Sequence, residues 1–313
     1  MTAISTRGLT RHFNDLVAVK DISLDVRQGE IFGLVGPDGA GKTTTMRMLT
    51  GILEPTSGTA SVAGYDIVQA SEQLKEHISY MSQRFGLYMD LTVMENIRFY
   101  ADVYMVPKKK RAAQYEKLLS FSNLTPFKDR LAGQLSGGMK QKLGLACALI
   151  HTPTVLFLDE PTNGVDPLSR RDFWRILYQL LKDGVTIFFS TAYLDEAERC
   201  SRLALMHRGE LLQVGTPDEI KKSIQSDVVQ LNLADSRTAR NVLREAYPDL
   251  KLSLYGERIH VLSRDTESTI SDVTTALKSA GISILNTRVL DPMLEDVFIE
   301  LTADGKRSEV HHA

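Results

Sequence analysis

The sequence predicts an α/β fold built on a parallel β-sheet, followed by a second, smaller α+β domain. Residues 31–35 form a β-rich run that enters a glycine-rich turn and then a helical segment at 42–53. Continuous apolar runs at 155–158 and 185–189 are typical of parallel strands buried on both faces. After about residue 220 the pattern changes. A strand, a glycine-rich turn and a helix, in that order, open an α/β domain.

Residues 1–220 are expected to form the larger domain. Alternating side chains at 4–9 and 18–26 predict strands of an antiparallel β subdomain. A helical pattern over about 86–150 predicts a helical subdomain, and an amphipathic helix is expected at 169–182, between the two apolar runs.

Residues 221–302 are expected to form the second domain. Its predicted order, βαββαβ followed by a last helix, suggests a small ferredoxin-like fold. The strands are expected at 228–233, 250–254, 259–262 and 282–289, and the helices at 236–247, 267–280 and 293–301. The polar residues 303–313 predict a disordered tail.

Composition excludes some classes of function. The formal net charge of −2 argues against a nucleic-acid-binding protein, which normally carries a basic excess. The two cysteines, Cys147 and Cys200, show neither metal-ligand spacing nor a disulfide pattern, which favours a reducing compartment. The N-terminus lacks the apolar segment of a signal peptide, and no apolar run approaches the roughly 18 residues that span a bilayer. A cytoplasmic protein that reaches a membrane only by docking to a partner is therefore expected.

The glycine-rich turn satisfies the pattern G-x-x-x-x-G-K-[ST] of a P-loop. Its successive backbone N–H groups form an anion-binding nest at a helix N-terminus, which suits the phosphates of ATP. Lys42 is expected to reach the β- and γ-phosphates, and the Thr43 hydroxyl to ligate Mg²⁺. A chance glycine-rich turn is the alternative, which the flanking strand and helix disfavour. The expected nucleotide-binding residues here are Gly36, Pro37, Asp38, Gly39, Ala40, Gly41, Lys42, Thr43 and Thr44.

Two acidic residues follow the buried run at 155–158. Ligands of α/β sheets bind outside the carboxyl ends of the strands, where these acids lie. Asp159 is expected to hold Mg²⁺, directly or through water, and Glu160 to polarise the attacking water as general base. Taken alone, an acidic strand end beside a loop is the simpler interpretation, but this one follows a P-loop.

The segment 135–141 reads LSGGMKQ and lies at the start of a predicted helix. Ser136 can cap that helix, while Gly137 and Gly138 expose N–H groups to an anion. A bare helix cap is the simpler alternative. The P-loop, this motif and the acidic strand end together closely resemble the ATP-binding cassette (ABC) family of ATPases, over about residues 4–220.

The resemblance implies a P-loop NTPase core with antiparallel β and helical subdomains, and it assigns further residues. Phe13 matches the aromatic that stacks on adenine, although a core aromatic is the alternative interpretation. Gln83 matches the glutamine that approaches Mg²⁺ and signals to the membrane domain, and Asp166 matches the dimer-contact aspartate. In this family ATP is held between two cassettes, so Ser136, Gly137 and Gly138 are expected to contact ATP bound by a second cassette, identical or different.

Position 192 departs from the family pattern. The family places a histidine that contacts the γ-phosphate after Ser190 and Thr191, where this chain has Ala192. Hydrolysis at this P-loop is therefore expected to be impaired, as in the histidine-lacking half of tandem two-ATPase exporters. A regulatory subunit that binds ATP without turnover is the alternative, which Ala192 favours and Glu160 opposes.

The end of the second domain indicates a branch of the family. Residues 291–302, DPMLEDVFIELT, resemble the ending of ATPase subunits from drug-type ABC-2 exporters. Residues 82–96 resemble the same branch, and so does Met139 in the segment 135–141, which is the signature motif of the family. The resemblance implies a separate integral-membrane permease docked near residues 83–96, and a second domain that helps dimerise the cassettes or is a passive appendage. A soluble ABC protein without a transport function is a rival interpretation. Such proteins typically carry a second cassette or a long coiled-coil insertion in the same chain, and this sequence shows neither. The basic run at 108–111 is interpreted as a solvated helix start, with contact to anionic lipid as the alternative.

Overall fold

The computed structural model describes residues 1–83 and 86–310. Arg84 and Phe85, which belong to the segment that resembles drug-type exporters, lie outside the described residues, as do residues 311–313. The chain forms two compact units, Met1–Leu212 and Gln213–Ala313.

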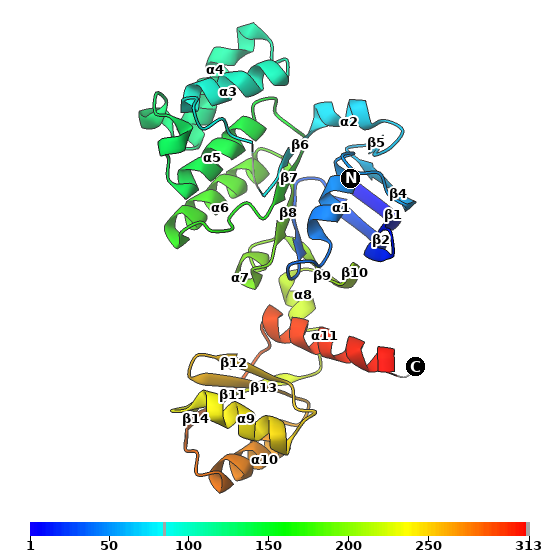
Figure 1. The fold of residues 1–313 in the computed structure, drawn as a ribbon, viewed down its shortest axis with the longest axis vertical. Helices are drawn as coiled ribbons and strands as arrows, with labels where there is room; N and C mark the ends of the chain where they lie inside the picture. The colour runs from blue at the N-terminus through cyan, green and yellow to red at the C-terminus, as the bar shows by residue number, and fades with distance from the viewer. Residues whose placement is uncertain (84–85, 311–313) are drawn as a thin grey trace. The chain divides into compact units, whose positions relative to one another are not determined.

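A six-stranded sheet in the order β10-β9-β3-β8-β7-β6 forms the centre of the first unit (Figure 1). Neighbouring strands from β9 to β6 run parallel. Every residue of β3, β7 and β8 is buried, because one hydrophobic cluster covers each face of the sheet. The strands are β3 (Ile31–Val35), β6 (Ile78–Met81), β7 (Val155–Asp159), β8 (Thr186–Thr191), β9 (Arg202–His207) and β10 (Glu210–Gly215).

An antiparallel sheet in the order β2-β1-β4-β5 and helix α1 (Lys42–Leu49) cover one face of the central sheet. This sheet contains β1 (Thr2–Phe13), β2 (Leu16–Arg27), β4 (Ser57–Val62) and β5 (Tyr65–Asp66). Helix α2 (Ser71–His77) leads from it back into β6.

Helices gather on the opposite face (Figure 1). They are α3 (Val93–Val103), α4 (Lys108–Phe121), α5 (Gly137–Ala148) and α6 (Pro167–Lys182), with 3-10 turns at Thr125–Phe127 and Ala132–Gln134. The short helix α7 (Leu194–Ala197) follows β8.

His151, just after α5, is held between this helical layer and the sheet. Its Nε2 lies 2.9 Å from the Ile78 carbonyl oxygen, and its ring stacks on Tyr104 with 4.0 Å between centroids. Its Nδ1 is buried without a hydrogen-bond partner in the described structure. Burial lowers the pKa of His151, so protonation favours the unfolded chain.

The contribution of His151 to stability is therefore expected to be fully present above its ordinary pKa of about 6.5 and to be lost as the pH falls towards its lowered folded pKa. His151→Phe keeps an aromatic ring next to Tyr104, loses the contact with the Ile78 carbonyl, and does not titrate. Denaturant unfolding of both proteins between about pH 5 and 8 should give a free-energy difference that shifts in favour of the variant at low pH. A difference that is constant with pH would contradict this role.

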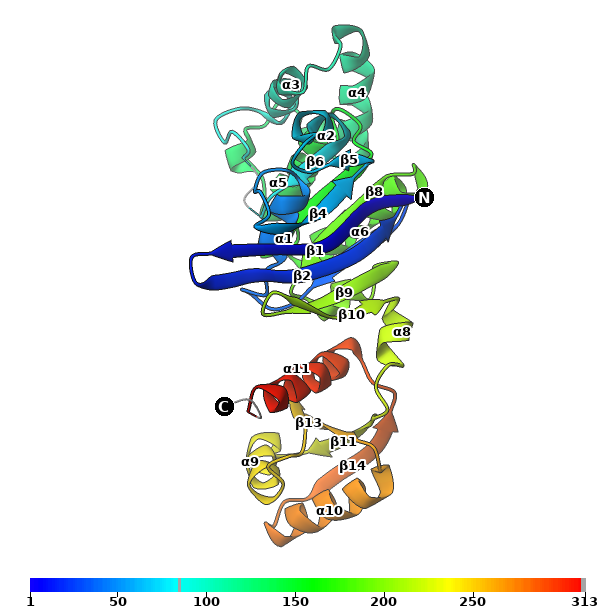
Figure 2. The ribbon, with the colours of Figure 1, turned by 90° about the vertical axis from the view of Figure 1, so that its right-hand side faces the viewer.

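The second unit has an antiparallel sheet in the order β12-β13-β11-β14, which is the ferredoxin-like topology expected from the sequence (Figure 1). Figure 2 shows α9 and α10 on one side of this sheet and α11 on the other. Apolar side chains on one face pack against α9 and α10. On the other face, helix α11 is attached by two contacts. His260 Nδ1 bonds to Asp296, and the Ser226 hydroxyl donates to Glu300. The elements are α8 (Pro217–Lys221), β11 (Asp227–Leu233), α9 (Ser236–Ala246), β12 (Leu252–Tyr255), β13 (Arg258–Ser263), α10 (Thr266–Ser279), β14 (Ile284–Leu290) and α11 (Leu294–Val310).

Two boundaries differ from those expected. The unit boundary lies at Leu212, within β10, rather than at residue 220, because α8 packs against α11 and so joins the second unit. The backbone of the expected disordered tail continues α11 as far as Val310. The residues after Thr302 include one glycine and no proline, so nothing in them stops a helix.

Candidate active site

The loop between β3 and α1 is shaped by glycines that two neighbouring segments require. A Cβ on Gly36 would lie 2.1 Å from the Met206 carbonyl oxygen, and one on Gly41 would lie 2.5 Å from that of Ala18. Gly39 faces open space and has a φ of +78°. Gly36 and Gly41 therefore let the loop pack closely against Met206 and Ala18, and Gly39 lies at the exposed turn of the loop.

Lys42, the first residue of α1, turns back over this loop. Its Nζ donates to the carbonyl oxygens of Gly36 and Pro37, at 2.7 and 3.0 Å. It also forms an ion pair of 3.0 Å with Glu160 Oε1. The Lys42 side chain is almost wholly buried, so the positive charge lies inside the loop and points to the end of β7.

Asp159, the last residue of β7, is held by three hydroxyl groups. Its Oδ1 accepts from Ser190 Oγ at 2.7 Å and from Thr43 Oγ1 at 3.2 Å, and its Oδ2 accepts from the Tyr80 hydroxyl at 3.0 Å. Burial, and then the negative charge of Asp159, raise the pKa of Tyr80. Tyr80 therefore stays a proton donor and fixes the direction of the carboxylate.

Glu160 follows in a left-handed conformation, with a φ of +47°. Such a conformation costs about 1–3 kcal/mol in a residue with a side chain and persists only where the surroundings enforce it. Its backbone N–H donates to the Ser190 carbonyl and hydroxyl oxygens, at 3.2 and 3.0 Å. Its Oε2 accepts from Gln83 Nε2 at 3.1 Å and from Asn163 Nδ2 at 3.4 Å.

The structure thus brings together five predicted residues from three segments of the chain: Lys42, Thr43, Gln83, Asp159 and Glu160. Tyr80 and Ser190 were not predicted. Ser190 lies directly opposite Asp159 in the register of β7 and β8, and Tyr80 lies one strand away on β6. Only the strand order could have identified them, because parallel strands place their carboxyl ends at one edge.

The predicted signature lies on another element. Ser136 caps α5 by accepting from the Met139 N–H at 3.3 Å, and Gly137 faces open space. A Cβ on Gly138 would lie 2.4 Å from the Ser169 side chain, so helix packing requires this glycine. Helix α5 packs on the face of the sheet opposite to α1 (Figure 1). The signature and the loop of residues 36–44 therefore belong to opposite layers of the unit.

The model of the ABC transporter family matches residues 19–163. The daunorubicin resistance ATP-binding protein DrrA2 of Streptomyces coeruleorubidus is 30% identical over 98% of this chain and 96% of its own length. The chain belongs to the ABC transporter family.

Other relatives agree. The probable multidrug ABC transporter ATP-binding protein YbhF of Escherichia coli (strain K12) is 42% identical over 98% of this chain and 53% of that protein. The chain thus spans about half the length of that relative. A solved ATP-binding subunit of an ABC transporter matches with a TM-score of 0.64 and 29% identity, over 71% of this chain and 92% of that one. The resemblance to ABC ATPases of drug-type exporters is thereby confirmed.

Phe13 lies at the end of β1, at the tip of the β1–β2 hairpin of this ABC cassette. It is 42% exposed, and the Arg11 guanidinium lies 4.7 Å from its ring centroid. The exposure contradicts the alternative of a core aromatic. One face of the ring is taken by Arg11, and stacking on a base remains a prediction.

Asp166 caps α6 of the cassette. Its Oδ1 accepts from the Ser169 N–H at 2.9 Å, and this hydrogen bond lowers its pKa.

Ala192 lies after β8 and is exposed. Among the described residues, no helix is long and apolar enough to cross a membrane.

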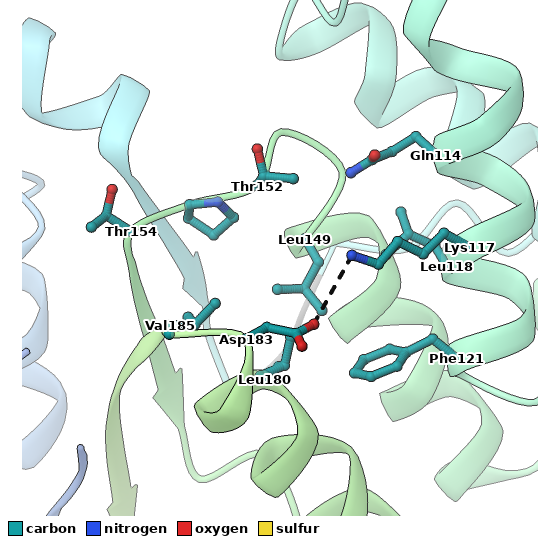
Figure 3. Close-up of a pocket in the computed structure, with 12 residues that line it drawn as sticks. Gln114, Lys117, Leu118, Phe121, Leu149, Thr152, Thr154, Leu180, Asp183 and Val185 are labelled. Atoms are coloured by element: carbon teal, nitrogen blue, oxygen red, sulfur yellow. Dashed lines mark ion pairs between the residues drawn. The ribbon is translucent and has the colours of Figure 1, made fainter. Parts of the chain in front are cut away.

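A cavity of about 300 Å³ lies elsewhere in the cassette (Figure 3). Its walls include Leu118 and Phe121 of α4 and Leu180 of α6, and Lys117 pairs with Asp183 across it at 4.0 Å. Thr154 and Val185, which also line it, directly precede β7 and β8. The cavity is therefore at the amino ends of the strands, away from the predicted site.

Proposed function

We propose that this chain binds MgATP in the loop of residues 36–44, hydrolyses it with Glu160 as general base, and thereby powers export through a separate ABC-2 type permease. The observation that carries this proposal is the meeting of Lys42 and Glu160, and of Thr43 and Asp159, at the carboxyl edge of the sheet. These are the groups that phosphoryl transfer to water needs: a phosphate-binding cation, metal ligands and a base.

Lys42 and Glu160 change partners in the proposed reaction. The phosphates of ATP compete with Glu160 for the Lys42 ammonium, because both are anionic and the Glu160 ion pair is 3.0 Å long. Transfer of Lys42 to the phosphates leaves Glu160 Oε1 able to accept a proton from the attacking water. Gln83, which bonds to the other oxygen of Glu160, keeps the carboxylate in place.

The residues fit a magnesium ion that ATP brings. Thr43 Oγ1 and Asp159 Oδ1 lie 3.2 Å apart, while the described residues hold no cluster of three His, Cys, Asp or Glu that could bind a metal ion alone. Mg²⁺ typically binds to one or two protein oxygens together with substrate phosphates. Thr43, Asp159 and Gln83 would hold it. When bound, Mg²⁺ neutralises negative charge that develops on the phosphates.

A second cassette is part of the proposal. We assign Ser136, Gly137 and Gly138 to ATP held by another copy or another chain. Ser136 and Gly137 are exposed at the start of α5, whereas Gly138 is buried against Ser169 and would offer its backbone N–H. Gly137 has open space above it for a phosphate. Asp166 would contact the partner cassette near the same interface.

Position 192 of the proposed site offers the γ-phosphate no side-chain donor, because alanine stands there. Ala192→His is expected to raise ATP turnover several-fold, because the imidazole could bond to the γ-phosphate and position the water. Steady-state phosphate release, with Ala112→His as a matched control at an exposed alanine of α4, measures this effect. Equal rates for wild type and Ala192→His would count against an impaired site.

A regulatory subunit that binds ATP without turnover is the second candidate function, and Ala192 favours it. Phosphate release by the isolated chain, and by the chain with its permease in proteoliposomes, separates the two. Turnover in either preparation supports an ATPase, and bound ATP without turnover in both supports the regulatory role. The names of the relatives, a multidrug transporter and a daunorubicin resistance protein, support export of a drug-like cargo. In this proposal the chain docks to its permease and lies peripheral on the inner face of the cell membrane.

A further inference from the structure

A buried carboxylate lies behind the proposed active site without being part of it. Glu196, in the short helix α7, has no exposed surface. Its Oε1 accepts from Thr162 Oγ1 at 2.5 Å, and its Oε2 accepts from Thr191 Oγ1 at 2.8 Å. A buried charge is costly unless it is paired and hydrogen-bonded, so these contacts are what make a glutamate tolerable here.

Two further groups complete the surroundings of Glu196. Trp174 Nε1 donates to Oε1 at 3.5 Å, and Arg170 Nε lies 3.6 Å from the same oxygen. Both come from α6, so the carboxylate also fixes that helix. Arg170 has other partners, since it pairs with Asp195 at 3.7 Å and lies over the Tyr193 ring.

The two threonines lie beside the positions that bear on catalysis, Thr162 in the loop after β7 and Thr191 at the end of β8. Thr162 is two residues after Glu160, and Thr191 directly precedes Ala192. Each threonine uses a different oxygen of Glu196. One carboxylate therefore joins the loop of the general base to the end of β8.

This connection restrains the strained residue. The backbone of Glu160, with its φ of +47°, is held from the upstream side by Ser190. On the downstream side, Thr162 is buried, and its hydroxyl is fixed by Glu196. Release of Thr162 would remove the restraint on that side and let the Glu160 carboxylate move from its place between Lys42 and Gln83.

We infer that Glu196 is a positioning residue for ATP hydrolysis: through Thr162 and Thr191 it holds the Glu160 carboxylate in the orientation that accepts the proton of the attacking water. This inference rests on the proposed function. The expected effect is a loss in kcat that exceeds any loss in ATP affinity. The loop of residues 36–44 meets this connection through the backbone, where the Gly36 N–H donates to the Thr191 carbonyl oxygen at 3.2 Å, and a change at Thr162 leaves that hydrogen bond in place.

The test removes the Thr162 arm of the connection and, separately, the charge of the Glu196 carboxylate. Thr162→Val removes the hydroxyl that Glu196 accepts from and keeps the side-chain volume, while Thr162→Ser restores the hydroxyl. Thr186→Val is the matched control: it removes another buried threonine hydroxyl, which accepts from the Gly29 N–H at 3.0 Å, at the start of β8. Glu196→Gln, which removes the charge that the two hydroxyls bond to, completes a double-mutant cycle with Thr162→Val.

For each protein, kcat, KM and the Kd for MgATP are measured, with the thermal midpoint as a check on folding. Thr162→Val and Glu196→Gln are expected to lower kcat by about 10- to 100-fold with little change in Kd, and the double variant to lower it no further. Thr162→Ser is expected to recover most of the rate, and Thr186→Val to keep the wild-type kcat.

Wild-type kcat in Thr162→Val would overturn this inference alone, as would an equal loss in Thr186→Val. Losses in Thr162→Val and Glu196→Gln that multiply in the double variant would also overturn it, because the two residues would then act separately. A wild-type protein without any turnover would overturn the proposed ATPase function and this inference with it.

Discussion

Glu160→Gln is expected to lower the rate of ATP hydrolysis by about 10²- to 10⁴-fold, the usual contribution of a general base. The amide keeps the shape of the side chain but cannot accept the proton of the attacking water. ATP binding should be retained, because the Lys42 ammonium no longer has a carboxylate as a competitor. Single-turnover hydrolysis, together with the Kd for MgATP, measures both effects.

The control for this substitution is Glu72→Gln, on the exposed face of α2, which removes a carboxylate with an 82% exposed side chain. It should hydrolyse ATP at the wild-type rate. Glu160→Gln and wild type with the same single-turnover rate would show that another group accepts the proton.

Lys42→Met is expected to weaken ATP binding by about 10- to 100-fold and to remove hydrolysis. Charge-assisted hydrogen bonds contribute about 1.5–3 kcal/mol each, and the buried ammonium offers such bonds to the phosphates. The substitution also leaves the Glu160 carboxylate without its cation, which adds repulsion to an incoming anion. Titration calorimetry with MgATP gives the change in Kd.

Lys75→Met, at an exposed side chain that pairs only with Glu72 among the ion pairs of the described residues, is the matched control and should bind as wild type does. Unchanged ATP affinity in Lys42→Met would exclude this lysine from phosphate binding and would contradict the proposed site.

The strands of the central sheet could be predicted because their burial is extreme. The residues of β3, β7 and β8 are buried on both faces, which gives the continuous apolar runs in the sequence. The antiparallel strands β1 and β2 extend beyond the predicted ranges, to Phe13 and from Leu16, because the exposed tip of the hairpin lacks an apolar pattern. Local patterns therefore identified the strands, but the predicted ends of β1 and β2 were too short where their residues are exposed.

The chemical groups of the site could be predicted from motifs, but their supports could not. Lys42 and Glu160 belong to patterns of adjacent residues. The hydroxyls of Tyr80 and Ser190, and the connection from Glu196, depend on which strands are neighbours and in which register. Gly138 was predicted for its exposed N–H, whereas its close packing on Ser169 is visible only in three dimensions.

The hydrolytic role of this site is tested most directly by phosphate release from MgATP by the purified chain, over a range of protein concentrations and with Mg²⁺ chelated by EDTA. We predict release that requires Mg²⁺ and rises more than in proportion to protein concentration, because the signature of one cassette serves the loop of another. ATP that binds without any phosphate release, at every concentration and with a permease present, would contradict an ATPase and leave the chain as an ATP-binding regulatory subunit.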